Sequence, residues 1–167
     1  MPIATYLHSA QALLAAWGGF QSAIAITRLQ TYESASEKLA EWSSEAARQL
    51  HKTRTTQASG ALGFLFSFAA SVFLATSDPT DRNSVLASPF LRYNAAPTMV
   101  IALLLARTHM RNYWAPRGDG KKVGWKPPIK MMEDYNEAQR RTENIMVILE
   151  ACAYSWMVAA VIVFFGW

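Results

Sequence analysis

The amino-acid sequence predicts an all-α protein, a four-helix bundle integral to a membrane. Three observations lead to this fold class. The chain has 167 residues, enough for one domain, and 51% of them are hydrophobic while 17% are charged. Long apolar stretches alternate with polar stretches along the chain. The basic residues gather in two of the connections between apolar stretches, which indicates an even number of membrane crossings.

Two stretches are clear membrane spans. About 20 apolar residues cross the ~30 Å hydrocarbon core of a bilayer. The stretch 145–167 is long enough, and Glu150 is its only charged residue. The stretch 59–76 carries no charge and covers about 27 Å at ~1.5 Å per residue. We therefore expect both stretches to cross the bilayer as helices.

The first apolar stretch, 3–27, is a weaker span. It is uncharged, but it contains the polar residues His8, Gln11 and Gln21. The alternative is a cleaved signal peptide, with the small residues 23–25 as its cleavage site. No basic residue precedes the apolar part, and cleavage would place a basic stretch outside the cell. We therefore favour a membrane span here.

The third stretch, 93–112, has a short apolar centre and is the weakest of the four. Asn94 is expected to cap its helix, which would place Pro97 in the first turn, where no helical hydrogen bond is lost. At the other end, Arg107 and Arg111 are expected to extend toward the membrane surface. With these additions the stretch is long enough to cross.

The basic residues support four crossings. Five of the 16 lie within 28–54, nine lie within 107–141, and the other two are Arg82 and Arg92. Four crossings bring the two basic parts to the same side of the membrane, whereas three would separate them. Because basic connections stay in the cytoplasm, both chain termini are predicted to lie on the non-cytoplasmic side.

The two basic connections have different character. The connection 28–57 shows an apolar stripe with helical spacing from Leu29 to Leu50, which predicts an amphipathic helix. The loop 107–130 combines lysine and arginine with tryptophan, a pattern typical of segments that contact anionic lipid headgroups. A helix starting near residue 129 is expected to run as one rod to the C-terminus.

Each predicted span has small residues at intervals of four, a spacing that lets helices pack closely in lipid. The predicted packing faces are Ala15, Gly19 and Ala23; Ser59, Gly63, Ser67 and Ser71; Thr98, Ala102 and Ala106; and Ala151, Ser155 and Ala159.

Glu150 is the main candidate for chemistry, because a carboxylate inside a membrane span is costly. It lies about 8 Å inside the last span, counted from residue 145 at ~1.5 Å per residue. The antiparallel third span brings Arg107 and His109 to a similar depth, and Tyr154 lies one turn further along the same helix. One interpretation is a structural Glu150–Arg107 ion pair. The other is a catalytic acid or base that acts on a lipophilic molecule, with Tyr154, Arg107 and His109 as further site residues.

These features leave two functions open. The first is an accessory or scaffold subunit for a membrane-bound partner or pathway. The alternative is a membrane-embedded oxygenase, isomerase or cyclase that uses Glu150 as acid or base. The sequence contains no HxxxH, ExxH or CxxC pair, so neither a cofactor nor a metal is predicted. The predicted partners are the bilayer and a membrane protein or second copy, without nucleic acid, in the endoplasmic reticulum or another internal membrane.

Overall fold

The computed structural model consists of four long α-helices, α1 (Pro2–Ala40), α2 (Ser44–Thr76), α3 (Pro89–Trp114) and α4 (Met132–Phe164). The structure describes residues 2–41, 44–77, 88–114 and 132–165, and no strand occurs within them. The predicted all-α fold with four helices is confirmed. The last helix also begins near the predicted residue and runs as one rod.

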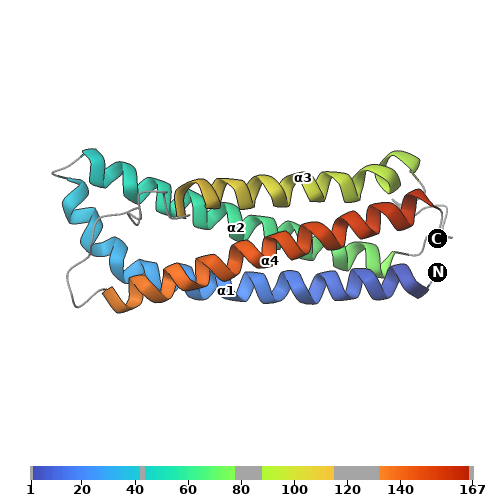
Figure 1. Cartoon of the computed structure of the whole chain (residues 1–167), viewed down its shortest axis with the longest axis horizontal. Coiled ribbons are helices and arrows are strands. Elements are labelled where there is room, and N and C mark those ends of the chain that lie inside the picture. The colour runs from blue at the N-terminus through green and yellow to red at the C-terminus, as the bar shows by residue number, and fades with distance from the viewer. Residues whose placement is uncertain (1, 42–43, 78–87, 115–131, 166–167) are drawn as a thin grey trace.

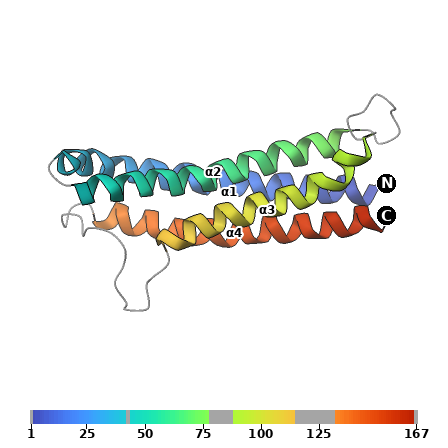
Figure 2. The same cartoon turned by 90° about the horizontal axis from the view of Figure 1, so that it is seen from above.

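The helices form an elongated bundle in which successive helices run in opposite directions (Figures 1 and 2). Helix α1 packs against α2 and α4, and α3 packs against the same two helices from the other side. Both chain termini lie at one end of the bundle, here called the terminal end. The opposite end, here called the basic end, holds the turn from α1 to α2, the end of α3 and the start of α4.

Among the described residues, three helical stretches are long and apolar enough to cross a membrane: Ala47–Thr76, Pro89–Trp114 and Glu137–Phe164. Helix α1 falls short because of its polar residues. However, His8, Gln11 and Gln21 all face the bundle interior and are buried. The outer surface of α1 instead exposes large apolar side chains, such as Leu13, Trp17 and Phe20. The histidine and the two glutamines that lower the hydropathy of the predicted first span therefore belong to the packed face of α1.

The bundle interior is held together by hydrogen bonds from indole and amide groups as well as by apolar contacts. Trp156 Nε1 donates to the hydroxyl of Ser67 over 2.9 Å. Trp114 Nε1 donates to the hydroxyl of Thr56, also over 2.9 Å. These bonds join α4 to α2 and α3 to α2 at two different levels. Buried polar groups need such partners, because an unpaired donor in an apolar interior is costly.

The third helix starts earlier than predicted. It begins at Pro89, so Pro97 lies inside the helix rather than in its first turn. Asn94 does not cap a helix, and its side-chain amide donates to the carbonyl of Phe90 over 2.8 Å. The apolar residues Phe90 and Leu91 extend the helix toward the terminal end. The predicted cap was wrong because proline at the first helical position, which Pro89 occupies, is an equally good start signal.

The connection 28–57 is helical, but it is divided between two elements. Its first part continues α1 to Ala40, and α2 begins at Ser44. Leu29 and Leu50, at the two ends of the predicted apolar stripe, are both buried. The side chains between them in that stripe lie outside the described residues. The basic loop predicted for 107–130 begins later, because residues 107–114 belong to α3, and its remainder from 115 to 130 lies outside the described residues.

The packing faces agree with the prediction on most of α2, where Ser59 is only half-buried, and differ on α1 and α3. On α4, Ala159 is buried while Ala151 and Ser155 are half-buried. Gly63, Ser67 and Ser71 are all buried on α2. On α1 the buried line is Ala15, Gly18, Ser22 and Ala25, so Gly18 rather than Gly19 contacts Phe64 of α2. On α3 the predicted residues Thr98 and Ala102 are exposed and only Ala106 is buried. Intervals of three as well as four are needed to follow a helix face.

Candidate functional site

Glu150 is the centre of a small polar cluster on α3 and α4, here called the Glu150 cluster. Arg107 Nη2 of α3 donates to Glu150 Oε2 over 2.7 Å, a distance typical of a charge-assisted hydrogen bond. The hydroxyl of Tyr154, one turn further along α4, donates to the other oxygen, Oε1, over 3.1 Å. Both carboxylate oxygens of Glu150 therefore already accept a hydrogen bond.

The Glu150 cluster lies on the outer surface of the bundle. The side chain of Glu150 is 33% exposed and that of Arg107 is 24% exposed. Tyr154 and Val147, which share this face of α4, are both more than half exposed. The cluster is therefore open to whatever surrounds the bundle, whether lipid or another protein.

His109 is separate from the Glu150 cluster. It lies on the exposed side of α3, two residues after Arg107 and therefore on a different face of the helix. Of the four residues proposed from the sequence, the structure brings Glu150, Arg107 and Tyr154 together. The geometry supports an ion pair that fixes the register of α3 against α4.

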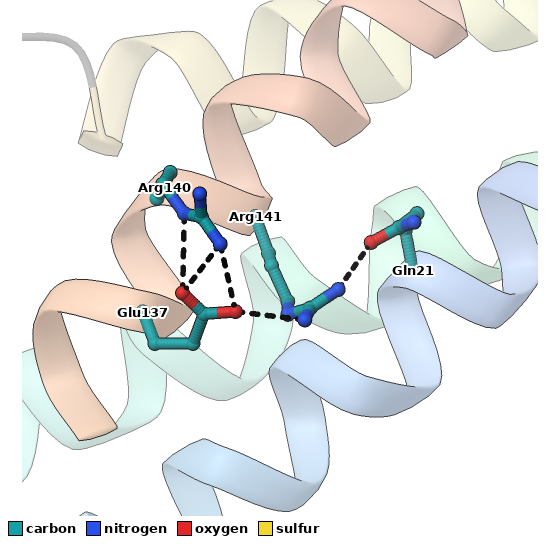
Figure 3. Close-up of polar contacts among 4 residues, drawn as sticks. All are labelled: Gln21, Glu137, Arg140 and Arg141. Carbon is teal, nitrogen blue, oxygen red and sulfur yellow. Dashed lines mark hydrogen bonds and ion pairs between the residues drawn. The ribbon is translucent and has the colours of Figure 1, made fainter. Parts of the chain in front are cut away.

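A second polar cluster joins α1 to α4 nearer the basic end (Figure 3), and it is here called the Arg141 cluster. Arg141 Nη1 donates to Gln21 Oε1 over 2.6 Å, and Arg141 Nη2 lies 2.7 Å from Glu137 Oε1. Arg140 Nη2 lies 2.9 Å from the other Glu137 oxygen. Glu137 is thus held between two guanidinium groups, and Arg141 ties α4 to the polar side of α1.

A third polar group, the His8 cluster, lies inside the bundle in the half toward the terminal end. His8 Nδ1 is 2.7 Å from Gln11 Oε1, which makes Nδ1 the donor. The His8 ring also contacts the indole of Trp156, with 5.7 Å between ring centroids. Gln11 Nε2 and the hydroxyl of Ser71 are buried without a hydrogen-bond partner among the described residues. This cluster couples α1 to α4 and, through the Trp156–Ser67 bond, to α2.

A cleft opens elsewhere, on the surface between the start of α3 and the end of α4. It has a volume of about 600 Å³. We call it the terminal cleft, and its lining residues are Tyr93, Pro97, Ala160, Val161, Val163, Phe164 and Phe165. The lining contains no residue of the Glu150 cluster. The carboxylate of Glu150 and the terminal cleft are therefore two separate features.

Sequence reasoning missed the Arg141 and His8 clusters. The residues carried a signal, because His8, Gln11 and Gln21 are the polar residues of an otherwise apolar stretch. Polar residues in a membrane helix generally face the bundle interior and find partners there. The partner of Gln21, however, lies 120 positions away in the chain. It becomes apparent only once α1 and α4 are seen side by side.

The fold and these clusters define a class of protein, a four-helix bundle with three helices suited to crossing a membrane. No protein-family model, no curated protein and no solved structure matches the chain. The functional assignment therefore depends on the geometry of the bundle itself.

Proposed function

We propose that the chain is an integral membrane protein whose four helices all cross the bilayer. We further propose that it serves as an accessory or scaffold subunit that docks against a helix of another membrane protein. The observation that carries this proposal is the exposure of the Glu150 cluster on an otherwise apolar outer face.

The crossing of α1 is supported by where its polar residues lie. Helix α1 turns His8, Gln11 and Gln21 inward and exposes large apolar side chains outward. Such an arrangement suits a helix surrounded by lipid, where polar groups are satisfied inside the bundle. Four crossings also bring both basic parts of the chain to one side, where the positive-inside rule places the cytoplasm.

Attachment to anionic headgroups is supported by exposed cations near the basic end. Lys52 of α2 and Arg111 of α3 are both exposed there. Each cation near an anionic surface contributes about 1 kcal/mol of attraction. An internal membrane such as the endoplasmic reticulum remains our proposed location.

The docking surface is supported by the cost of exposing charge to lipid. The face defined by Val147, Glu150 and Tyr154 carries a carboxylate and a hydroxyl, while the neighbouring surface is apolar. A polar helix from a partner would shield this pair and use the remaining acceptor capacity of Glu150. Hydrogen bonds of this kind hold helices together in membranes.

The enzyme alternative receives less support. Glu150 accepts hydrogen bonds from Arg107 and Tyr154, so both of its oxygens are already engaged by side chains of the bundle itself. The terminal cleft, which could hold a lipophilic molecule, is lined by other residues. Acid or base catalysis needs the carboxylate within hydrogen-bond reach of the substrate.

Site-specific photo-crosslinking in native membranes tests the docking surface. A photoreactive residue replaces Val147 on the Glu150 face, and in a separate variant it replaces Leu62 on the outer face of α2. The two positions lie at matched depth, because the α2 glycines at 60 and 63 lie against Ile145 and Leu149 of α4. We expect one discrete protein adduct from position 147 and lipid adducts alone from position 62.

A further variant tests whether the adduct depends on the charged cluster. Replacing both partners, Glu150→Leu with Arg107→Leu, makes the face apolar and should remove the adduct from position 147. An adduct that survives this change would show that the cluster does not direct docking. An adduct with a second copy of the chain would replace the accessory role with self-association, and lipid adducts alone at both positions would exclude docking.

A further inference from the structure

The terminal cleft combines an apolar lining with one backbone acceptor that lacks its usual donor. In an α-helix each N–H donates to the carbonyl four residues earlier, and proline has no N–H. Pro97 lies inside α3, so the carbonyl oxygen of Tyr93 does not receive that bond. Both residues line the cleft. A carbonyl that lacks its helical donor has acceptor capacity left for the hydroxyl of a ligand.

The position of the cleft suits the head of a neutral lipid. Tyr93, Phe164 and Phe165 are exposed aromatic residues at the terminal end of the bundle. Tyrosine, unlike phenylalanine, is enriched at the boundary between the hydrocarbon core and the headgroups, so Tyr93 marks this depth. A lipid whose only polar group is a hydroxyl places that group at the same boundary. In the proposed membrane arrangement, Tyr93 and its carbonyl would lie at the depth where such a lipid has its head.

The shape of the cleft favours a compact ring system over a single acyl chain. Its lining covers residues 93–97 on α3 and 160–165 on α4. At ~1.5 Å per residue these stretches are roughly 6–9 Å long. The cleft is open to the surroundings of the bundle, and a lining this short can contact only part of an extended acyl chain. A compact fused-ring body makes more of its dispersion contacts within such a short lining than one extended chain does.

We propose that the terminal cleft binds a sterol. The ring system lies against Val161, Val163 and the aromatic residues of the cleft, and the sterol hydroxyl donates a hydrogen bond to the carbonyl oxygen of Tyr93. Because the sterol enters sideways from the bilayer, the site depends on the bundle being embedded in a membrane. It does not depend on a protein partner.

A matched pair of probes tests the hydrogen bond. The full chain is placed in phosphatidylcholine nanodiscs with a photoreactive, alkyne-tagged cholesterol analogue, or with the 3-O-methyl ether of the same analogue. The ether keeps the ring body and loses the donor. One hydrogen bond contributes about 1 kcal/mol net, so we expect about fivefold more labelling by the hydroxyl probe. The labelled peptides should contain residues 93–97 or 160–165.

Three variants identify the acceptor and the cleft. Pro97→Ala restores the N–H that pairs with the Tyr93 carbonyl, and it should reduce the fivefold preference to about one. Pro89→Ala is the matched control, because a proline at the first helical position frees no carbonyl. Tyr93→Phe removes the phenol and should keep the preference. Val161→Trp fills the cleft and should lower labelling by both probes.

Several outcomes would overturn the proposal. Equal labelling of the natural chain by the two probes would show that the sterol hydroxyl does not contribute to binding. A preference that persists in Pro97→Ala, or disappears in Tyr93→Phe, assigns the acceptor elsewhere. Labelling outside the cleft excludes the site itself. Competition by unlabelled diacylglycerol but not by cholesterol would replace the sterol with a chain lipid. These expected results do not depend on a protein partner. If the crosslinking experiment yields no protein adduct at position 147, the expected sterol labelling stays the same.

Discussion

Glu150 is less costly in α4 than its apolar neighbours suggest, because Arg107 lies opposite it on α3. A charge near the centre of a membrane helix costs about 2.5–3.5 kcal/mol on insertion scales, and less near the ends. Glu150 lies near the middle of the stretch Glu137–Phe164, where its 2.7 Å ion pair with Arg107 offsets part of this cost. The pairing could be anticipated from the sequence, since antiparallel helices bring residues at equal depth together. The position of His109 could not, because it depends on how α3 is rotated.

Removing one member of the pair should reveal the coupling between them. We expect Glu150→Gln and Arg107→Met each to destabilise the protein by about 1–3 kcal/mol, because each leaves a partly buried group without its charged partner. The double variant should recover part of this loss. The measurement is thermal unfolding of the purified protein in mild detergent.

Glu143→Gln is the matched control for this cycle. Glu143 lies on α4 two turns before Glu150 and is exposed, so its replacement should leave the melting temperature nearly unchanged. If the effects of Glu150→Gln and Arg107→Met simply add, the ion pair does not stabilise the contact between α3 and α4.

At the level of helices, the contact between α1 and α2 depends on one glycine. A Cβ atom at Gly18 would collide with the ring of Phe64, which is buried in the core. At the neighbouring Gly19 the nearest atom to an added Cβ is Phe64 Cβ, at 4.0 Å, an ordinary contact distance. Two adjacent glycines therefore have very different roles.

We expect Gly18→Ala to destabilise the bundle by about 1–3 kcal/mol, since the core must shift to admit the methyl group. Gly19→Ala should be neutral or stabilise by up to about 1 kcal/mol, because alanine favours the helix. Thermal unfolding of the two variants in the same detergent compares them directly. Equal effects from both substitutions would mean that α1 packs against α2 in another rotation.

The small-residue pattern predicted that helices pack closely but not which face does so. An interval of four selects one row of residues, while the buried line on α1 alternates intervals of three and four. The pattern succeeded on α2, where Gly63, Ser67 and Ser71 face the interior. It failed on α3, where Thr98 and Ala102 face outward because Leu103, Ala106 and Met110 occupy the core. Small residues are frequent on both faces of such helices, so their spacing alone does not show which face packs against the neighbouring helices.

For the whole molecule, the sequence predicted the number and order of the helices from apolar length and charge. Both termini lie at one end of the bundle, in agreement with an even number of antiparallel helices (Figure 1). The outward and inward faces of α1 could not be read from composition, because its average polarity hides their difference. The terminal cleft also escaped the sequence, since it requires the start of α3 and the end of α4 to meet.

The crossing of α1 is the central claim, and labelling of single cysteines in sealed membranes tests it most directly. Cys152 is buried and is the only cysteine, so Cys152→Ala provides the background. Single cysteines then replace Ile3, Ser44 and Ser88, and each variant is treated with a membrane-impermeant maleimide. We predict that positions 3 and 88 react from the non-cytoplasmic side and that position 44 reacts from the cytoplasmic side. Reaction of positions 3 and 44 from the same side would contradict the four-crossing bundle.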